Sequence, residues 1–425
     1  MAPTISGYNY YAGYSLPFVH SVFDYFQLPT GACVLDPWNG SGATTRVAKW
    51  RKINSIGFDL NPATLVIARA GLIDWNTIVG SVQPLSEHLL EQTQQILAQK
   101  SSSPQGSEEP FNQWFTPTTS GVLRNLELTV RATLVGLSSA QTTQFSPLAA
   151  FFYLALFRMA RDLTKPFCGS NPTWIKTAIS AQDRLNIPAE DIYVTFQCAI
   201  NELSHSFAEW DAHQAANNVK NPKTETSSDV RLDVADSRYL PLPDKSVDAV
   251  ITSPPYCTRI DYVVAMLPEL AVIGVSVSEA KLLKRRLLGT NTVLSSFLPY
   301  QMTWGKACRK LLQAIKKHPS RASDTYYLKW ATQYFDSLYN SLREINRVLK
   351  PNSFCAIVVQ DSHYKDVKID LPLIVCEMAS TIKWAFAGQS SYTGKSTMAN
   401  VNPKVKIYRN RSSAEECVLV FKTNK

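Results

Sequence analysis

Short apolar runs alternate with longer segments of helical periodicity over much of the chain. Six runs of four to six residues are dominated by apolar side chains and predict strands at 33–36, 55–59, 230–234, 247–252, 354–359 and 417–421. Between them, apolar residues at helical spacing predict helices, including 44–50, 62–71, 334–349 and 371–385. Because strands alternate with helices, we expect an α/β fold with a mainly parallel sheet covered on both faces.

Residues 111–213 carry apolar residues at helical spacing only. Pro188 and the acidic residues that follow it suit the first turn of a helix, because of proline's fixed φ and the helix dipole. Polar stretches at 101–110 and 214–229 flank this region and predict linkers. The chain therefore divides into an N-terminal core part, a mostly helical insertion that is a candidate for target recognition, and a C-terminal core part: 1–82, 83–229 and 230–425.

The first predicted strand ends in a glycine-containing turn within VLDPWNGSGATT, 34–45. Gly40 and Gly42 permit a sharp turn and a close approach to a ligand at the carboxyl end of the strand. The third glycine of the dinucleotide fingerprint is absent, and Asp36 would repel a phosphate but suits a cationic amine. Asp59, nineteen residues after Gly40, ends the second strand, where a carboxylate can hold ribose hydroxyls. An amine-bearing nucleoside without a phosphate describes S-adenosylmethionine, although this motif alone fits an ordinary strand–helix turn equally well.

The fourth predicted strand leads directly into Ser253, Pro254, Pro255 and Tyr256, called the SPPY loop below. Two prolines fix φ and remove two backbone donors, so the loop is stiff and presents oxygen acceptors and an aromatic ring. An exocyclic nucleobase amine is a poor nucleophile because its lone pair is delocalised into the ring. Ser253 Oγ and the Pro254 carbonyl can bond both amine hydrogens and favour a more tetrahedral nitrogen, while Tyr256 can stack on the base. The alternative is a proline-stiffened strand end with a buried tyrosine.

The two motifs together resemble those of the DNA amino-methyltransferases, which modify N4 of cytosine or N6 of adenine. DPWNGSGATT resembles the cofactor motif of that family and SPPY its catalytic motif. Residues 8–23 resemble the segment that closes over the methionine end of the cofactor, and 230–240 the strand that precedes the adenine-contacting Asp236. EINRVLK, 344–350, resembles the helix before the fifth strand. The resemblance covers about 1–80 and 230–425, and the helical segment matches no generic motif.

The resemblance implies a Rossmann-like methyltransferase sheet, S-adenosylmethionine as cofactor and two sets of residues. The catalytic set is the SPPY loop itself. The cofactor-binding set joins the first turn, the end of the second strand and the residues after the third strand: Asp36, Pro37, Trp38, Gly40, Ser41, Gly42, Asp59, Leu60, Asp236 and Ser237. Trp38 departs from the family, which usually has phenylalanine there.

The target base follows from two further features. Serine at the start of SPPY favours cytosine N4, because many adenine enzymes carry Asp or Asn at that position. The order of the motifs, with the cofactor motif first, differs from the commonest arrangement of N4-cytosine enzymes. We therefore expect a cytosine-N4-specific DNA methyltransferase and keep three alternatives: N6-adenine methylation, guanine-N2 methylation of RNA, and a DNA-binding protein without catalytic activity.

The distribution of basic residues along the chain indicates where a nucleic acid would bind. The 425 residues include 43 Lys and Arg against 34 Asp and Glu, a formal net charge of +9, yet 281–330 alone holds eleven basic residues and one acid. A basic segment after a base-modifying loop predicts phosphate binding, although a solvated charged face would give the same count. The target amine is inaccessible inside a duplex, which implies base flipping. The residues expected to contact double-stranded DNA are Arg259, Lys284, Arg285, Arg286, Lys306, Arg309 and Lys310.

Several other classes of protein do not fit. No apolar run reaches the length of about eighteen residues that spans a bilayer, and the N-terminus lacks the features of a secretory signal, so we expect a cytoplasmic, nucleoid-associated bacterial protein without a membrane partner. The histidines show no metal-ligand spacing, so no metal is expected. The chain has no Pro-Cys dipeptide, which cytosine C5 methylation requires. A separately encoded restriction endonuclease would be the natural further partner.

Overall fold

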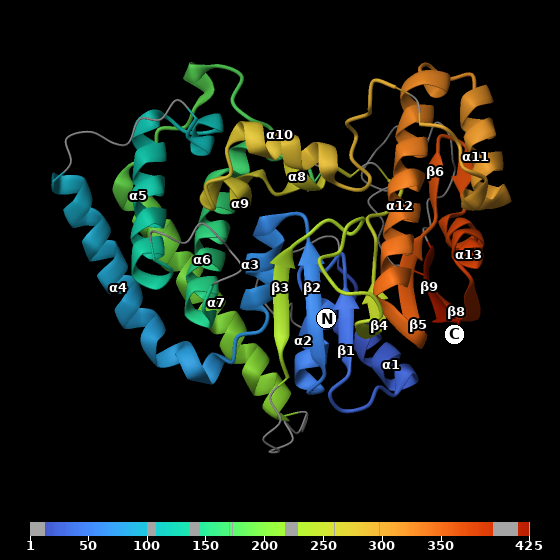
Figure 1. Cartoon of the computed structure of the whole chain (residues 1–425). Coiled ribbons are helices and arrows are strands. Elements are labelled where there is room, and N and C mark those ends of the chain that lie inside the picture. The colour runs from blue at the N-terminus through green and yellow to red at the C-terminus, as the bar shows by residue number, and fades with distance from the viewer. Residues whose placement is uncertain are drawn as a thin grey trace.

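A single seven-stranded sheet forms the centre of the protein (Figure 1). The computed structural model describes residues 13–99, 108–136, 145–169, 171, 173–216, 228–258, 260–296, 298–393 and 415–424. The sheet order is β3-β2-β1-β4-β5-β9-β8. Its strands are β1 (Cys33–Asp36), β2 (Asn54–Asp59), β3 (Val230–Val234), β4 (Val247–Thr252), β5 (Leu349–Gln360), β8 (Trp384–Thr393) and β9 (Glu415–Thr423).

The first five strands of the sheet run parallel, and β9 pairs antiparallel with both β5 and β8. The predicted α/β fold is therefore confirmed, with an antiparallel hairpin added at one edge. The strand β8 was missed, because its residues 384 and 385 were assigned to the end of the helix 371–385; that helix ends at Thr381 and β8 begins at Trp384. Between them, Lys383 adopts a left-handed φ of 66°, which breaks the helix.

Helices cover both faces of the sheet, as the alternation of side chains along the strands requires. Val34 packs in a core with α1 (Leu16–Phe26) and α2 (Ala43–Trp50). Leu35, the next residue, packs in the opposite core. That second core is covered by α11 (Gly305–Lys317), α12 (Leu328–Val348) and α13 (Leu371–Thr381), with a small hairpin of β6 (Ser362–Tyr364) and β7 (Val367–Ile369) beside α11. Short 3₁₀ turns span Pro110–Gln113, Lys165–Phe167, Ala181–Asp183 and Met302–Trp304, and a π turn spans Ser323–Tyr327.

The order of the strands reverses between β1 and β4. Leu35 of β1 lies opposite Val250 of β4, so the carboxyl ends of these two strands, Asp36 and Thr252, lie side by side. In open α/β sheets, ligands bind outside the carboxyl ends of the strands at such a switch point. The fold thus brings the glycine turn and the SPPY loop to one place.

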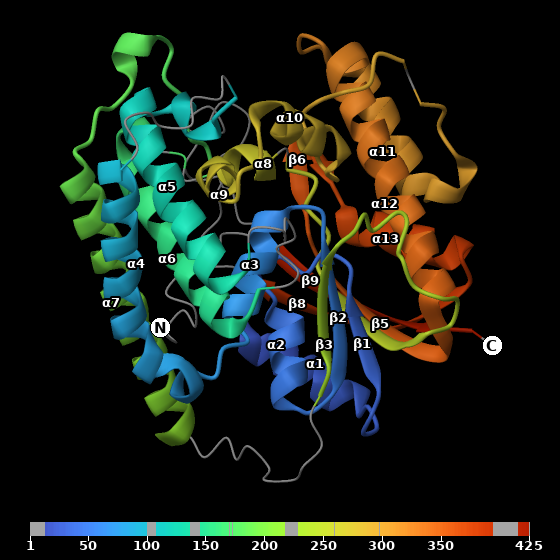
Figure 2. The ribbon, with the colours of Figure 1, turned by 60° about the vertical axis from the view of Figure 1, so that its left-hand side comes forward.

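The insertion forms a helical lobe with an apolar core of its own, beside the β3 edge of the sheet (Figures 1 and 2). Its helices are α4 (Trp75–Gln99), α5 (Pro117–Leu134), α6 (Pro147–Leu163) and α7 (Ala189–Ala216), and α3 (Pro62–Ala70) packs against α6. The lobe begins at Trp75, before the expected boundary at 83, because Trp75 and Ile78 are buried in its core. Of the expected linkers, 101–107 and 217–227 lie outside the described residues.

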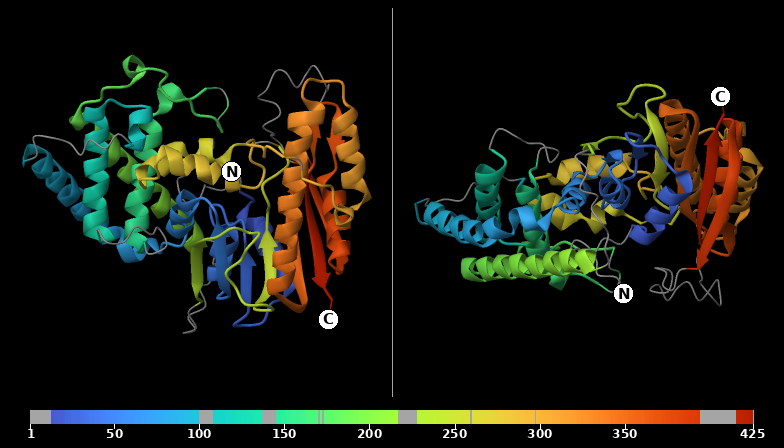
Figure 3. Two further views of the ribbon diagram at one scale, coloured as in Figure 1. Left: turned by 45° about the horizontal axis from the view of Figure 1, so that its top comes forward. Right: turned by 90° about the horizontal axis from the view of Figure 1, so that it is seen from below.

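Three short helices that follow the SPPY loop belong to the same lobe: α8 (Tyr262–Ala265), α9 (Leu267–Val272) and α10 (Val277–Arg286). Their side chains, including Val263, Leu270 and Ala280, are buried in the helical core. Figure 3 shows these helices lying between the lobe and the carboxyl edge of the sheet. The sequence placed them in the α/β core, because helices this short carry too few turns to show which apolar surface they pack against.

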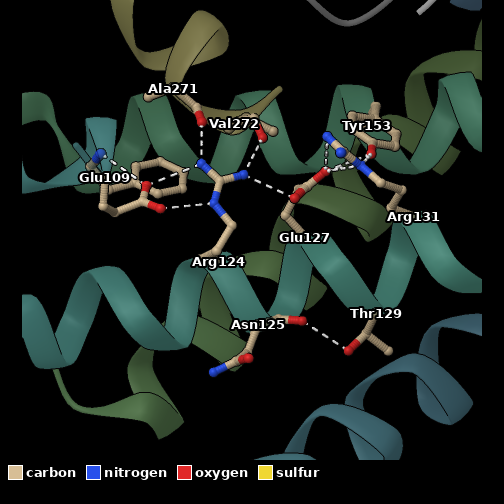
Figure 4. A network of polar contacts seen from close by, with 10 residues as sticks. Glu109, Arg124, Asn125, Glu127, Thr129, Arg131, Tyr153, Ala271 and Val272 are labelled. Atoms are coloured by element: carbon tan, nitrogen blue, oxygen red, sulfur yellow. Dashed lines mark hydrogen bonds and ion pairs between the residues drawn. The ribbon is translucent and has the colours of Figure 1, made fainter. Parts of the chain in front are cut away.

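Arg124 of α5 fastens α9 to the lobe (Figure 4). Its guanidinium donates to both carboxylate oxygens of Glu109, to Glu127, and to the carbonyls of Ala271 and Val272 at the end of α9. All five guanidinium N–H groups are therefore used. The Ala271 carbonyl also accepts from the Gly274 N–H at 3.1 Å, so Arg124 adds a second donor there.

A second arginine makes a parallel connection from α6. Arg161 pairs with Glu269 of α9, whose side chain is fully buried, and donates to the Ala265 carbonyl of α8. Arg158, also on α6, pairs with Glu202 of α7, and Arg161 lies at the contact between α6 and α9.

No single helix in the described ranges is both long and apolar enough to cross a membrane. The bent pair α3 and α4 passes the same test of length and composition only when its two helices are taken together.

Arg124→Ala should lower the free energy of unfolding by about 3 kcal/mol, because it leaves the half-buried Glu109 without its charge partner and the buried Glu127 with Arg131 alone. Arg158→Ala is the matched control, since its pair with the exposed Glu202 should contribute no more than about 1 kcal/mol. Urea unfolding followed by far-ultraviolet circular dichroism measures both. Equal losses of unfolding free energy in the two variants would contradict the role of Arg124 in holding α9 on the lobe.

Candidate active site

The turn after β1 takes its shape from two glycines with positive φ. Gly40 has a φ of 49° and Gly42 a φ of 83°, conformations that other residues adopt only with strain. A Cβ on Gly42 would lie 2.9 Å from the Cβ of Ala68 in α3, so the close packing of α3 also requires glycine there. The Gly40 N–H donates to Asp59 Oδ2 over 3.0 Å, which joins the turn to the end of β2.

Asp59, at the end of β2, is the residue expected to hold the ribose hydroxyls of the cofactor. Its carboxylate accepts from the backbone N–H of Gly40 and, at 2.8 Å, from that of Asn61. An ionised carboxylate has about four acceptor positions, so roughly two stay open. Burial raises the pKa of Asp59 to about 6, against the opposing effect of the two backbone hydrogen bonds. The group is therefore ionised at neutral pH and fits the two hydroxyls of a ribose.

Asp36 is more enclosed than the sequence indicated. Only 1% of the residue is exposed, and its carboxylate accepts from Tyr14 Oη at 2.8 Å, Thr252 Oγ1 at 2.6 Å and the Trp38 N–H at 3.2 Å. Burial raises the pKa of this carboxyl. The expected contact with the cofactor's amine stays a prediction. In this structure, Asp36 joins β1, β4 and the segment before α1.

Tyr14 lies within the 8–23 segment that was expected to close over the cofactor, of which residues before 13 lie outside the described part. Its hydroxyl bonds to both Asp36 and Thr44. Burial, followed by the charge of Asp36, raises the pKa of Tyr14, so the phenol stays a donor at neutral pH. Sequence reasoning placed the segment here but did not single out this side chain.

The other expected cofactor residues occupy three kinds of position. Pro37 and Leu60 are buried at the strand ends, while Trp38 and Ser41 are half-buried on the turn. Asp236, which follows β3, accepts from Arg238 Nε at 2.9 Å and from Arg238 Nη2 at 2.7 Å. Ser237 Oγ bonds to Ser341 Oγ of α12 at 2.8 Å, which ties that hydroxyl to the neighbouring helix. The structure thus brings Asp36, Gly40, Gly42 and Asp59 together at the switch point, with Asp236 at the neighbouring strand end.

The SPPY loop follows β4 directly beside this turn. Thr252, the last residue of β4, donates to Asp36 of the cofactor motif. Ser253, the next residue along the chain, therefore lies close to that motif in space. Ser253 Oγ donates to the Val358 carbonyl of β5 over 3.1 Å and also interacts with the hydroxyl of Tyr256. Pro254 is buried, and no donor among the described residues bonds its carbonyl. Two acceptors therefore stand in sequence at the end of β4.

The second half of the loop is held from two sides. Tyr334 Oη of α12 donates to the Pro255 carbonyl over 2.8 Å, and Tyr256 Oη donates to Glu416 Oε1 of β9 over 3.0 Å. The Tyr256 ring is half-buried. Burial, and then the charge of Glu416, raise the pKa of Tyr256, so its hydroxyl stays protonated. Sequence reasoning missed Tyr334 and Glu416, which have no local signal and reach the loop only through the fold.

The basic residues do not form one strip. Arg259 lies outside the described residues. Lys284 of α10 pairs with the buried Asp261 at 2.6 Å, while Arg285 and Arg286 are exposed. Lys306, Arg309 and Lys310 are exposed on α11, which packs on α13 on the other side of the protein from the helical lobe (Figure 1). The basic segment thus supplies two separate surfaces, one beside the site on α10 and one on α11.

The described residues include no group of three or more His, Cys, Asp or Glu side chains that could share a metal ion.

The fold and the candidate site fit a methyltransferase that uses S-adenosylmethionine. Gly40 and Gly42 hold the turn at the carboxyl end of β1 in positive-φ conformations, and Asp59 has acceptor capacity for ribose hydroxyls, so the residues present fit this cofactor. No known family profile matches the chain.

The curated proteins that this chain resembles are type II methyltransferases. Over 445 aligned residues, 94% of this chain and 82% of the relative, the chain is 23% identical to the type II methyltransferase M.BsoBI of Geobacillus stearothermophilus. It is 30% identical to the type II methyltransferase M.AvaI of Nostoc sp. (strain PCC 7120) over 146 residues, 32% of this chain and 30% of that protein. The expected resemblance to DNA methyltransferases is confirmed.

Among solved structures, the [4+2]-cyclase SpnF is 8% identical with a TM-score of 0.33, over 96% of this chain and 80% of its own. The rRNA methyltransferase aviRa of Streptomyces viridochromogenes is 11% identical with a TM-score of 0.30, over 99% of this chain and 90% of its own. Both scores are too low to bear on the activity.

If Asp59 binds the ribose, cofactor affinity should depend on pH. Protonation removes acceptor capacity, so affinity should rise as pH rises through about 6 and be about tenfold weaker at pH 5 than at pH 7. Asp59→Asn should weaken binding and abolish this dependence. Calorimetric titration with S-adenosylmethionine from pH 5 to 8 measures it, with Asp233→Asn on β3 as the control that keeps the dependence. An unchanged pH profile in Asp59→Asn would contradict the assignment.

Proposed function

We propose that this chain is a site-specific DNA methyltransferase that transfers a methyl group from S-adenosylmethionine to the N4 amine of a flipped cytosine. The observation that carries the proposal is the pair of acceptors, Ser253 Oγ and the Pro254 carbonyl, beside the glycine turn at the β1–β4 switch point. Such a pair matches the two hydrogens of an exocyclic amine. When bound, S-adenosylmethionine supplies a methyl group on a positively charged sulfur.

The chain's own contribution is to make the amine nucleophilic. Ser253 Oγ and the Pro254 carbonyl each accept one amine hydrogen, which favours a tetrahedral nitrogen and directs its lone pair away from the ring. Because the hydroxyl of Ser253 donates to Val358, its oxygen is held as an acceptor before substrate arrives. Pro254 and Pro255 keep the loop from relaxing, so little reorganisation is needed when the base binds. The methylated nitrogen then loses a proton to solvent, and no general base is needed.

Duplex DNA as the substrate is supported by the type II methyltransferase relatives and by the charge on α10 and α11. Arg285 and Arg286 lie at the end of α10, whose last carbonyl accepts from Arg238 near the end of β3. They are thus near enough to the site to contact phosphates around the flipped base. Flipping costs a few kcal/mol, which phosphate contacts and stacking on Tyr256 would offset. The helical lobe, which begins at Trp75 and includes α8 to α10, is the proposed target-recognition region.

Cytosine N4 is favoured over adenine N6 by the serine that begins the loop. Methylation at a defined short site would protect DNA from a separately encoded restriction endonuclease, as part of a restriction-modification system. The protein would act in the bacterial cytoplasm on the nucleoid.

The variant Ser253→Ala with Pro254→Ala should lower methyl transfer to duplex DNA at least about 100-fold and leave cofactor binding nearly unchanged, because it removes one acceptor and loosens the other. Tritium incorporation from labelled S-adenosylmethionine measures transfer, and calorimetry measures cofactor binding. Ser246→Ala, at the opposite end of β4, is the matched serine control.

Transfer RNA in the same assay tests the RNA alternative. Wild-type turnover in the double variant would overturn the catalytic assignment. Incorporation into transfer RNA in preference to DNA would replace the substrate, and failure of the wild-type chain to bind the cofactor would favour a DNA-binding protein without activity.

A further inference from the structure

Glu416 of β9 contacts the proposed catalytic loop and has no part in the chemistry above. Its Oε1 lies 3.0 Å from Tyr256 Oη and accepts the phenol's hydrogen bond. The residue is half-buried and sits opposite Gln360 at the carboxyl end of β5. Glu416 therefore places a carboxylate directly beside Tyr256, the residue proposed to stack on the target base.

The direction of β9 brings Glu416 to the site. Parallel strands deliver only their last residues to the carboxyl edge of the sheet, whereas β9 runs antiparallel to β5 and therefore begins at that edge. Its second residue, Glu416, is paired with Gln360 of β5 on one side and Tyr392 of β8 on the other. Because both neighbours fix the strand, the carboxylate is attached to a rigid element.

The Tyr256 ring needs such an anchor. The loop backbone is fixed by Tyr334 Oη on the Pro255 carbonyl and by the Thr258 N–H on the Tyr256 carbonyl at 2.7 Å. These contacts leave the ring free to turn about its two side-chain torsions. The bond to Glu416 holds the far end of the half-buried ring. Stacking is worth about 1–3 kcal/mol per base and depends on the ring lying in the right plane.

We propose that Glu416 is a positioning residue that fixes the plane of the Tyr256 ring, so that the target base stacks with its amine at Ser253 and Pro254. This inference rests on the proposed function. A bond from a neutral phenol to a charged carboxylate is about twice as strong as one between neutral groups, which suits a bond that must persist while the base enters. Glu416 touches neither the base nor the cofactor in this account and acts through Tyr256 alone.

The test is a double-mutant cycle on Glu416→Ala and Tyr256→Phe. Both changes remove the bond between Tyr256 and Glu416 and keep an aromatic ring at 256, and Tyr256→Phe also removes the phenol's interaction with Ser253. Each should lower single-turnover methyl transfer to unmethylated plasmid DNA by about 10- to 100-fold at saturating cofactor, with calorimetric binding of S-adenosylmethionine unchanged. The double variant should lose no more than Tyr256→Phe alone, because the bond to Glu416 can be removed only once. Glu416→Gln, which keeps an acceptor oxygen, should recover most of the rate.

Asp244→Ala serves as the charge control. It removes an exposed carboxylate before β4, at the opposite edge of the sheet, and should leave the rate unchanged. If Glu416→Ala does not fold, Tyr256→Phe together with Glu416→Gln still decides the matter, since the first removes the bond and the second keeps it. The proposal would be overturned if the rate loss in the double variant equalled the product of the two single losses. A wild-type rate of methyl transfer in Glu416→Ala or in Tyr256→Phe would also overturn it. Absence of transfer by the wild-type chain would instead overturn the proposed function, so the two failures are distinguishable.

Discussion

The hydrogen bond between Thr252 and Asp36 joins two motifs that lie 216 positions apart in the chain. It spans the switch point of the sheet, where the strand order proceeds from β1 to β2 on one side and from β4 to β5 on the other; ligands bind at such points in open α/β sheets. Asp36 is buried, so its charge must be compensated by hydrogen bonds, and Tyr14, Thr252 and the Trp38 N–H provide them. Everything proposed about the site depends on this contact, because it sets the SPPY loop beside the glycine turn.

The helical lobe is connected to the site through the chain that leaves the SPPY loop. Arg124 and Arg161 hold α8 and α9 on the lobe, and Lys284 of α10 pairs with Asp261, five residues after Tyr256. A DNA contact made by the lobe would thus act on an element continuous with the catalytic loop. This arrangement supports a recognition role for the lobe, which remains part of the proposal.

The sequence was sufficient for the parts of the protein that have a local pattern. The strand ends at Asp36, Asp59 and Thr252 were predicted because a buried run stops at a turn or a proline. Contacts between distant segments have no such pattern, so Tyr334 and Glu416 were missed. A count of charge along the chain also treated 281–330 as one surface, whereas the fold places α10 on the helical lobe and α11 on α13.

The central claim is that this chain methylates cytosine N4 in DNA, and nucleoside analysis of host DNA tests it most directly. The wild-type chain would be expressed in a bacterial strain without DNA methyltransferases of its own, and the DNA digested and analysed by mass spectrometry. The account predicts N4-methylcytosine in that DNA and none in DNA from cells that express the Ser253→Ala, Pro254→Ala variant. N6-methyladenine in its place, or no modified base, would contradict it.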